Sequence, residues 1–418
     1  MAHDQKVLHD RALAYHENPT PGKIKVVITK PAETADDLTL AYSPGVAEPV
    51  KEIANNPDDA YRYTGKGNSV AIISNGTAIL GLGNLGPLAS KPVMEGKALL
   101  FNRFAGIDAI DIEVNNKSVD DFITTVECIA DTFGGINLED IKAPECFTIE
   151  RELIKRCKVP IFHDDQHGTA IVTTAGILNA VELQGKKIGD CKVVCVGAGA
   201  AGVACSNLLL ASGANKKNFF MVDRHGVIRS DRPQYNNGEK PNFINDAGPK
   251  TLSEAMKDAD VLLGVSGPGL ISEDDVKSMA KNAVIFACSN PDPEVDPALV
   301  ERVRPDIIMG TGRSDYPNQI NNVLCFPYLF RGTLDVRATC INTEMKLAAM
   351  NALKDLAKEP VPPEVVKAAQ VDKLEYGRDY LIPKPMDPRL LKKLSRAVAE
   401  AAVKTGVARI PMPEHYME

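Results

Sequence analysis

Two pairs of neighbouring carboxylates each follow an apolar run in this sequence. Glu139 and Asp140 follow G-G-I-N-L, while Asp164 and Asp165 come just after residues 159–162, which resemble a short buried strand. Open α/β sheets bind ligands at the carboxyl ends of their strands. Hard divalent ions such as Mg²⁺ and Mn²⁺ prefer carboxylate oxygens and leave positions open for substrate oxygens. The two pairs therefore indicate a metal site, although acids at these places can also cap helices.

A glycine-rich turn between a strand and a helix is the second chemical signal. Residues 192–196 form a continuous apolar run, and residues 203–212 can form a helix. A second apolar run at 218–222 then delivers Asp223, about twenty residues beyond the glycines, which completes the dinucleotide-binding pattern. The turn would bind a pyrophosphate at the helix N-terminus. Its residues are Gly197, Ala198, Gly199, Ala200, Ala201 and Gly202.

The side chains after the second strand leave the choice between NAD and NADP open. Asp223 is placed to accept a hydrogen bond from a ribose 2′-hydroxyl, which favours NAD. Arg224 and His225 directly follow it and could bind a 2′-phosphate, which favours NADP.

Another G-x-G-x-x-G pattern lies at Gly81, Gly83 and Gly86. The loop-like stretch from residue 87 to 92, with a proline at each end, is poor material for a cofactor-binding helix, so we interpret this pattern as a tight loop. A helix is predicted at 93–104, with Lys97 among apolar neighbours. A desolvated lysine can act as a base, but most helical lysines extend their amino group to solvent.

Further polar residues stand in predicted turns. Tyr42 precedes a Ser-Pro-Gly turn, where a tyrosine is usually a packing residue. Asn290, Asn321 and Asn322 follow predicted strands on the cofactor side. Neutral amides can hold hydroxyl and carboxylate oxygens, although asparagine in a turn often serves only the turn.

The totals exclude several classes of protein. A net charge of -7 over 418 residues offers no basic face for nucleic acid, and no run of eighteen apolar residues could span a membrane. The nine cysteines form no C-x-x-C pair, so we expect free thiols rather than zinc or disulfides. We therefore expect a cytoplasmic protein without nucleic-acid or membrane partners.

The elements that position these groups alternate between strand and helix, which predicts an α/β fold. We expect an N-terminal α/β substrate domain at residues 1–165 and a Rossmann-like, doubly wound parallel sheet at 166–330. A helical segment at 331–418 should fold back on the first domain. The last residues resemble a linker rather than the end of a domain.

Six segments together are more specific than any single motif. They are L-A-Y-S-P-G-V-A-E-P, I-S-N-G-T-A-I-L-G-L-G-N-L-G, P-V-M-E-G-K-A-L-L-F, F-G-G-I-N-L-E-D-I-K-A-P-E-C-F, I-F-H-D-D-Q-H-G-T-A and T-G-R-S-D-Y-P-N-Q-I-N-N-V-L-C-F-P. The set resembles the bacterial malic enzymes in order over nearly the whole chain. It is most similar to the malic domain of the hybrid type, in which a phosphotransacetylase-like domain follows.

This resemblance implies oxidative decarboxylation of (S)-malate to pyruvate and CO₂, with Mg²⁺ or Mn²⁺ and with NADP favoured over NAD. It also implies a homodimer or higher homo-oligomer. The family's matched positions are Glu139, Asp140 and Asp165 for the metal, Lys97 for the base, Tyr42 for the acid, and Asn290, Asn321 and Asn322 for the substrate.

Two points refine this assignment. Asp164, next to the metal ligand Asp165, is expected to pair with Lys97 and tune it as a base. Ala78 stands where larger relatives of the family carry an arginine for a malate carboxylate, so Thr77, backbone amides and the asparagines are the candidates to hold that carboxylate. Asn290 also lies on the cofactor side of the cleft.

Two rival functions stay open from the sequence. One is a metal-independent hydroxy-acid or amino-acid dehydrogenase with a similar two-domain plan. The other is a nucleotide-binding regulatory module without catalysis.

Overall fold

Two parallel sheets form the centre of the computed structural model, which describes residues 2–232 and 238–416. The first sheet has the order β2-β1-β3-β4, with β1 at Ser69–Ser74, β2 at Asp108–Glu113, β3 at Gly135–Leu138 and β4 at Ile161–His163. All its neighbouring strands are parallel, and β1 and β3 lie in the middle. The middle strands are buried along their length, so they do not show the alternating burial of a strand with one face in solvent.

The second sheet has the order β10-β9-β8-β5-β6-β7. Its strands are β5 (Val193–Val196), β6 (Phe219–Asp223), β7 (Gly226–Val227), β8 (Val261–Gly264), β9 (Val284–Ala287) and β10 (Ile308–Thr311). The strands are parallel except β7, which pairs with the end of β6 in the antiparallel sense. The order reverses at β5, as in a doubly wound dinucleotide-binding fold, so the predicted fold class is confirmed.

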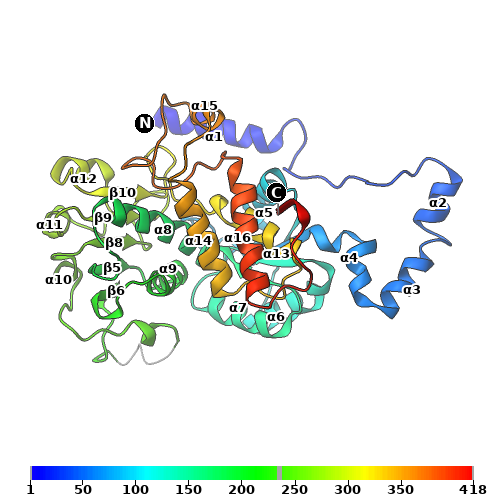
Figure 1. Cartoon of the computed structure of the whole chain (residues 1–418), viewed down its shortest axis with the longest axis horizontal. Helices are drawn as coiled ribbons and strands as arrows, with labels where there is room; N and C mark the ends of the chain where they lie inside the picture. Colours follow the sequence, from blue (N-terminus) through cyan, green and yellow to red (C-terminus); the bar gives the residue numbers. More distant parts are fainter. Residues whose placement is uncertain (1, 233–237, 417–418) are drawn as a thin grey trace.

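Helix α8 (Asp164–Leu183) connects the two sheets (Figure 1). Fourteen of its twenty residues are buried, which is expected of a helix with apolar residues on all sides. It packs against α9 (Ala200–Ala211) and α14 (Thr343–Leu356). A single buried apolar cluster reaches from β1 through α8 to β5, so the two sheets share a core.

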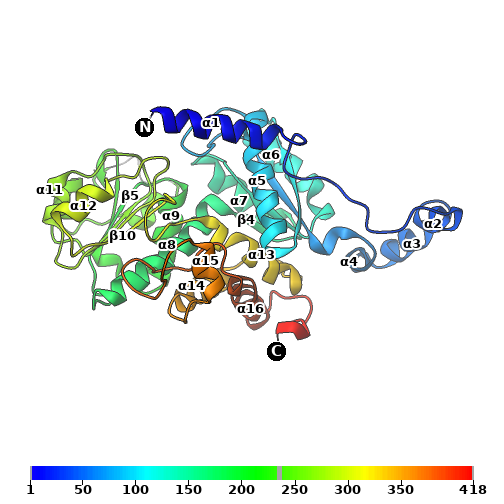
Figure 2. The same ribbon diagram turned by 90° about the horizontal axis from the view of Figure 1, so that it is seen from above.

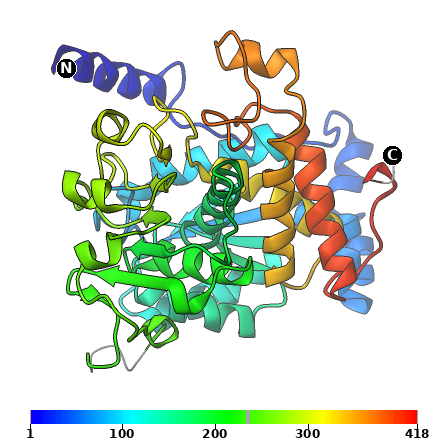
Figure 3. The same ribbon diagram turned by 60° about the vertical axis from the view of Figure 1, so that its left-hand side comes forward.

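The remaining helices flank these sheets. In the first half they are α5 (Pro87–Ala105), α6 (Val119–Ile129) and α7 (Glu145–Arg156), and in the second α10 (Leu252–Met256), α11 (Glu273–Ser278) and α12 (Pro297–Val303). The chain then returns through α13 (Phe326–Asp335), α14, α15 (Pro363–Ala368) and α16 (Arg389–Lys404). Figure 3 shows α14 and α16 side by side.

The return of the chain places α13 on the first half of the molecule. Phe101 of α5 makes edge-to-face ring contacts with Phe326 and Phe330, at centroid distances of 4.8 and 5.3 Å. Helix α14 instead packs on α8, where the Asn179 side chain donates hydrogen bonds to the carbonyl groups of Lys354 and Leu381. The division of the chain into domains at residues 165 and 330 stays a prediction. The contacts of α13 and α14 and the shared core cross both boundaries.

One local prediction was wrong. Helix α5 begins at Pro87 rather than at residue 93, with Pro92 inside it. Pro87 occupies the first helical position, where a missing N–H costs nothing, so the proline that argued for a loop in fact begins a helix. Residues 24–29 have no assigned secondary structure and no strand partner among the described residues.

We call residues 24–55 the N-terminal arm. It contains α2 (Ala35–Ala41) and α3 (Ala47–Asn55), and it follows α1 (Ala2–Glu17) and precedes α4 (Ala60–Tyr63). Figures 1 and 2 both show α2 and α3 projecting away from the sheets. In the described chain neither helix buries a residue, although the arm carries Val26, Ile28, Leu38 and Leu40. Most of its apolar side chains are therefore exposed in the described part of one copy of the chain.

Among the described residues, no helix combines the length and the apolar content that crossing a membrane requires.

Candidate functional site

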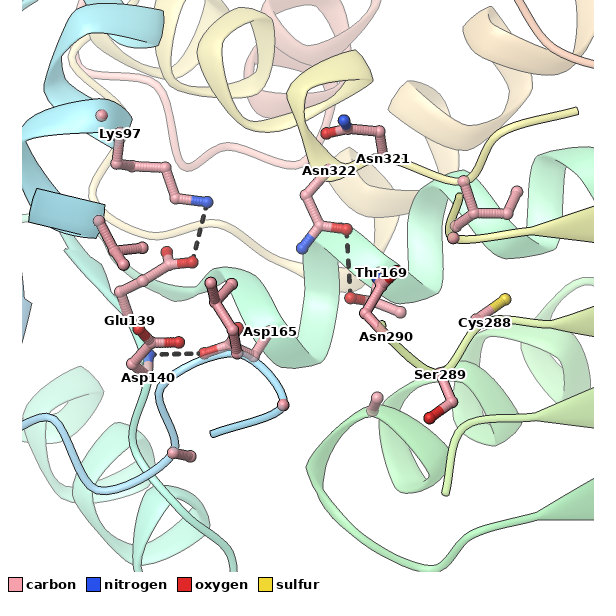
Figure 4. A pocket seen from close by; sticks show the side chains of 18 of the residues that line it. Lys97, Glu139, Asp140, Asp165, Thr169, Cys288, Ser289, Asn290, Asn321 and Asn322 are labelled. Atoms are coloured by element: carbon pink, nitrogen blue, oxygen red, sulfur yellow. Dashed lines mark hydrogen bonds and ion pairs between the residues drawn. The ribbon is translucent and has the colours of Figure 1, made fainter. Parts of the chain in front are cut away.

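A cavity of about 750 Å³ lies between the two sheets (Figure 4). One wall carries side chains from α5, from the turn after β3 and from the start of α8. The opposite wall consists of the loops that follow β8, β9 and β10. The carboxyl ends of both sheets thus face the same space, as the sequence predicts for a ligand site.

Three carboxylates converge on the first wall. Glu139, Asp140 and Asp165 each offer an oxygen, and these oxygens lie within 4.8 Å of one another. The Asp140 N–H donates to Asp165 Oδ2 at 2.8 Å, and Asn137 donates to Glu139 Oε2 at 2.8 Å. Asp140 itself has a left-handed φ of 55°, which aspartate tolerates better than most residues. The turn after β3 is thereby folded against the first turn of α8.

The charges of this cluster favour a cation. Burial and the neighbouring Asp165 raise the pKa of Asp140 to about 7. Burial and nearby acids also raise the pKa of Glu139 well above its usual range, despite Lys97. Within the described residues, Asp140 Oδ2 is buried without a hydrogen-bond partner. Clustered carboxylates with an unpaired buried oxygen fit a hard divalent metal such as Mg²⁺ or Mn²⁺.

Lys97 reaches this cluster from α5. Its Nζ lies 2.6 Å from Asp164 Oδ2, 2.9 Å from Glu139 Oε1 and 4.1 Å from the centroid of the Phe326 ring. Burial lowers the pKa of Lys97, but Asp164 and Glu139 outweigh it and raise that pKa well above its usual value. This direction is opposite to the one that desolvation alone would give, because the two acids hold the amino group protonated.

Asp164 is fully buried beneath Lys97, so the expected pair between these two residues is confirmed. Its Oδ2 also accepts a hydrogen bond from the Asn322 side chain at 3.1 Å. A Cβ atom on Gly168 would lie 1.8 Å from Asp164 Oδ1, so only glycine fits one turn further along α8. Asp164 and Gly168 together fix where the Lys97 amino group can lie.

The predicted asparagines all line the cavity (Figure 4). Asn322 is held by Asp164 and by the Thr169 hydroxyl, which donates to its Oδ1 at 3.2 Å. Asn321 Oδ1 accepts from the Val323 N–H at 3.0 Å, so its oxygen serves the turn. Asn290 lies on the opposite wall, next to Ser289 and Cys288. The amides thus surround the cavity from the cofactor side.

Two predicted residues are not brought to the cavity. Tyr42 belongs to the N-terminal arm, is 75% exposed and is not among the residues that line it. Thr77 is also absent from the lining, although Ala78 contributes to it. The Thr77 hydroxyl donates to Asn75 at 2.7 Å and accepts from the Lys142 N–H at 3.0 Å, so it is already engaged.

The second glycine pattern forms the turn between β5 and α9. A Cβ on Gly202 would lie 1.9 Å from the carbonyl oxygen of Gly197, and one on Gly197 would lie 2.5 Å from the carbonyl oxygen of Val265. A Cβ on Gly199 would meet nothing within 4 Å, so this middle position faces open space. The turn, with Ala198 and Ala200 between its glycines, therefore fits a pyrophosphate that approaches the backbone.

Asp223 ends β6, and its carboxylate is surrounded by donors. The His225 N–H donates to Oδ1 at 2.9 Å, Arg232 lies 3.5 Å from the same oxygen, and Lys240 donates to Oδ2 at 3.2 Å. Arg224 is exposed and lines a second cavity, and His225 is exposed beside it. Arg232 and Lys240 were not predicted from the sequence, since they lie in a polar segment without a recognisable motif.

A further missed group supports the first wall from behind. Glu150 of α7 accepts hydrogen bonds from His167 Nε2 at 2.9 Å, from Gln166 at 3.2 Å and from the His163 N–H at 3.2 Å. Burial raises the pKa of Glu150, but the neighbouring His167 and Lys346 outweigh it and hold this pKa at about 2. The sequence D-D-Q-H could have predicted such a partner, because Gln166 and His167 must point away from the cavity that Asp165 faces.

Comparison with known proteins agrees with this geometry. The family model for the malic enzyme N-terminal domain matches residues 21–154, and the model for the malic enzyme NAD-binding domain matches residues 166–374. A crystal structure of malic enzyme from Pyrococcus horikoshii Ot3 has a TM-score of 0.88 at 42% identity, and the match covers 98% of this chain and 95% of that one.

Curated relatives extend the comparison. The NADP-dependent malic enzyme of Halomonas elongata is 62% identical over 405 residues, which cover 97% of this chain and 96% of the relative. The NADP-dependent malic enzyme of Escherichia coli K12 is 54% identical, and the match covers 97% of this chain but only 54% of that longer relative. The chain thus spans nearly all of some relatives and about half of others.

Proposed function

This chain belongs to the malic enzyme family, and from that premise we propose that it oxidises and decarboxylates (S)-malate to pyruvate and CO₂, with NADP⁺ preferred over NAD⁺. The observation that carries the proposal is one cavity that holds a buried lysine, three converging carboxylates and the loops of a dinucleotide-binding sheet. NADP is supported by the relatives from Halomonas elongata and Escherichia coli, whereas a relative from Rhizobium meliloti at 47% identity is NAD-dependent.

Glu139, Asp140 and Asp165 would hold the divalent ion through their converging oxygens. When bound, a Mg²⁺ or Mn²⁺ ion would polarise the substrate's C2 oxygen and offset the acids that keep Lys97 protonated. Glu150 positions the ligand Asp165 through its bonds to the same first turn of α8. NADP⁺ would supply the hydride acceptor on the opposite wall.

Lys97 would take the proton of the malate C2 hydroxyl at Nζ. Asp164 positions that amino group, since its own carboxylate is fixed by Asn322 and by the close approach of Gly168. Asn290, Asn321 and Asn322 would orient the hydroxyl and carboxylate oxygens without adding charge. Because Thr77 is engaged elsewhere, we now assign the malate carboxylate to the asparagines rather than to its hydroxyl.

Tyr42 would return a proton to C3 after CO₂ leaves. Because Tyr42 lies in the arm, away from the cavity of its own chain, it would have to act in the cavity of a second copy of the chain. We propose a homodimer in which the arm of one copy covers the cavity of the other. The unburied apolar side chains of the arm support this, because a soluble protein rarely leaves such a strip uncovered. The free state of all nine cysteines suits a reducing compartment such as the cytoplasm.

A mixing experiment tests whether Tyr42 acts in the partner. Co-expressed Lys97→Ala and Tyr42→Phe chains should form mixed dimers in which one cavity has both groups, and about a quarter of wild-type activity should return. Each variant alone should have little activity. Mixed dimers no more active than the two parents would show that Tyr42 does not act across the interface.

The activity itself is tested with purified protein, malate, NADP⁺ and Mn²⁺. We expect NADPH, pyruvate and CO₂ in equal amounts, and loss of all three on addition of excess EDTA. Full activity in EDTA, or oxaloacetate that accumulates without decarboxylation, would favour a metal-independent dehydrogenase. No reduction of either cofactor would favour a nucleotide-binding module without catalysis.

We also propose that this chain is most similar to the malic domain of the hybrid type, in which a phosphotransacetylase-like domain follows. It is supported by the longer relatives, of which this chain spans about half.

A further inference from the structure

A further cavity, of about 300 Å³, lies between α8, α9 and α14, which Figure 1 shows next to one another. Asp165 and Thr169 of α8 line the central cavity, whereas His167 and Ala170 line this one. Since successive residues of a helix turn by about 100°, these two pairs lie on opposite faces of α8. The further cavity is therefore behind the first wall, and the proposed reaction does not use it.

Lys346 of α14 brings a positive charge to this cavity. Among the described residues, its amino group has no hydrogen bond and no ion pair, and it lines the cavity. Burial lowers the pKa of Lys346, and Glu150 only partly opposes this effect. Lys97 shows the contrast, because its Nζ lies within 2.9 Å of two carboxylates. A desolvated ammonium group without a counter-ion is costly, so the cavity favours an anion.

Other donors surround the same space. The Asn207 side chain and the Thr343 hydroxyl line the cavity, and neither has a hydrogen-bond partner in the described part of the chain. Thr343 is the first residue of α14, and the N-cap Asn342 accepts only from the Met345 N–H. The N–H groups before Met345 point out of the helix end and add a partial positive charge. Hydrogen-bond donors around one cation suit an oxyanion.

Glu150 does not supply the missing counter-ion. Its carboxylate accepts hydrogen bonds from the His167 ring and from the His163 N–H, at 2.9 and 3.2 Å, and so belongs to the first turn of α8. Lys346 and Glu150 nevertheless act on each other through space, since each shifts the pKa of the other. The same turn carries Asp165, so a charge beside Lys346 acts on the turn that holds a proposed metal ligand.

We propose that this cavity binds a small phosphate oxyanion, held by Lys346, Asn207 and Thr343. A volume of about 300 Å³ is about ten times the share of one water molecule in the liquid, so inorganic phosphate and a small organic phosphate both fit. The bound negative charge should strengthen metal binding on the other side of α8. The site goes beyond the proposed function, and only its coupling to the metal rests on that function.

Acetylation of lysines in the full chain tests the site directly. Acetic anhydride modifies unprotonated amino groups, and mass spectrometry after digestion gives the rate at each lysine. Inorganic phosphate at ten times its Kd should slow acetylation of Lys346 about tenfold relative to chloride at the same ionic strength. Lys354 lies on the same helix outside the cavity, so its rate should not change.

Glycerol 3-phosphate in place of inorganic phosphate distinguishes the two sources of the oxyanion. Stronger protection by glycerol 3-phosphate would identify a metabolite phosphate, and stronger protection by inorganic phosphate would identify the free ion. Asn207→Ala should weaken the protection by roughly tenfold in concentration, which corresponds to one hydrogen bond to a charged group. Equal acetylation of Lys346 in chloride and in both phosphates would overturn the site.

Manganese titrations followed by electron paramagnetic resonance test the coupling. Sulfate is the probe here, because phosphate precipitates Mn²⁺. Replacing chloride with sulfate at constant ionic strength should tighten the Kd for Mn²⁺ by roughly two- to fivefold, as expected for a charge acting across a helix. Lys346→Met should abolish this difference, whereas Lys354→Met, whose lysine pairs with Asp355, should retain it. Weak association of Mn²⁺ with sulfate in solution is the same for both variants.

The outcomes separate this inference from the proposed function. An equal Kd for Mn²⁺ in sulfate and chloride would overturn the coupling. Failure of the wild-type chain to bind Mn²⁺ would overturn the proposed metal site, yet protection of Lys346 from acetylation would still decide whether the oxyanion binds. Retained Mn²⁺ binding by Lys346→Met shows that this variant is folded.

Discussion

The two walls of the central cavity face the same space but differ in the charge of their side chains. The wall from the first sheet holds Lys97 close to four carboxylates, and burial together with neighbouring charges raises the pKa values of Glu139, Asp140 and Asp164. The wall from the second sheet presents Ser266, Asn290 and Ala201 of the glycine turn, all without charge. A charged wall can hold a metal and move a proton, whereas a neutral wall can hold a cofactor by its backbone. We infer that a substitution on one wall can change catalysis without changing cofactor binding, and that a substitution on the other wall can do the reverse.

The two glycine patterns show the same contrast on a smaller scale. Both have the spacing G-x-G-x-x-G and both precede a helix. In the second-sheet turn, Gly202 packs against Gly197 of its own turn. In the first-sheet loop, a Cβ on Gly81 would lie 2.5 Å from the carbonyl oxygen of Asn290, which belongs to the opposite wall. Equal spacing therefore serves a cofactor turn in one case and contact between the walls in the other.

Removal of the Lys97 amino group should cause the largest effect. Lys97→Ala should lower kcat for malate by about 100- to 10,000-fold, the usual contribution of a general base. NADP⁺ affinity, measured by calorimetry, should change by less than about threefold, because no contact joins Lys97 to the neutral wall. Lys91→Ala on the same helix is the control, since Lys91 pairs with Asp111 outside the cavity. Wild-type turnover by Lys97→Ala would remove its role.

The metal ligands come next. Asp165→Asn should weaken Mn²⁺ binding by at least about 100-fold, more than the loss of a supporting residue outside the ligand set. Asp164→Asn should leave Mn²⁺ affinity nearly unchanged but lower kcat, because Asp164 positions Lys97 and is not part of the converging set. Titration with Mn²⁺ followed by electron paramagnetic resonance measures both. Equal losses of Mn²⁺ affinity in the two variants would contradict the division between ligand and positioning residue.

The sequence predicted most of the charged wall, since its residues belong to short local patterns. Glu139-Asp140 and Asp164-Asp165 each follow a buried strand, and parallel strands bring such ends together. The pair between Lys97 and Asp164 was also predictable, because the family motif implies both. The fold class followed from the alternation of strands and helices.

What the sequence could not predict depends on contacts between distant segments. Arg232 and Lys240 contact Asp223 only because the chain folds back after β7, and no local pattern in that polar segment predicts these contacts. The family resemblance assigned Tyr42 the role of the acid, yet its arm lies outside the cavity of its own chain. Thr77 is engaged by Asn75 and Lys142 through a loop geometry that no local pattern specifies.

A change of pH should affect the charged wall alone. Since the pKa of Asp140 is raised to about 7, its carboxylate is mostly protonated below that pH and must lose the proton to bind a metal. The apparent Kd for Mn²⁺ should therefore tighten by about tenfold per pH unit below 7 and level off above it. Calorimetry should detect at least one proton released on binding at pH 6. A Kd for Mn²⁺ independent of pH between 5.5 and 7 would place the carboxylate pKa lower.

The smallest effects should separate the two glycine patterns. Gly199→Ala should leave the free energy of unfolding within about 0.5 kcal/mol, because its Cβ meets nothing within 4 Å and its φ of −89° is allowed for alanine. The same methyl group should weaken NADP⁺ binding severalfold, since it stands where the backbone approaches the pyrophosphate. Gly81→Ala should do the reverse and lower the free energy of unfolding by about 1–3 kcal/mol through its clash with Asn290. Urea unfolding and calorimetry on both variants measure this crossover. If Gly81→Ala weakened NADP⁺ binding as much as Gly199→Ala without loss of stability, the first pattern would be a cofactor turn as well.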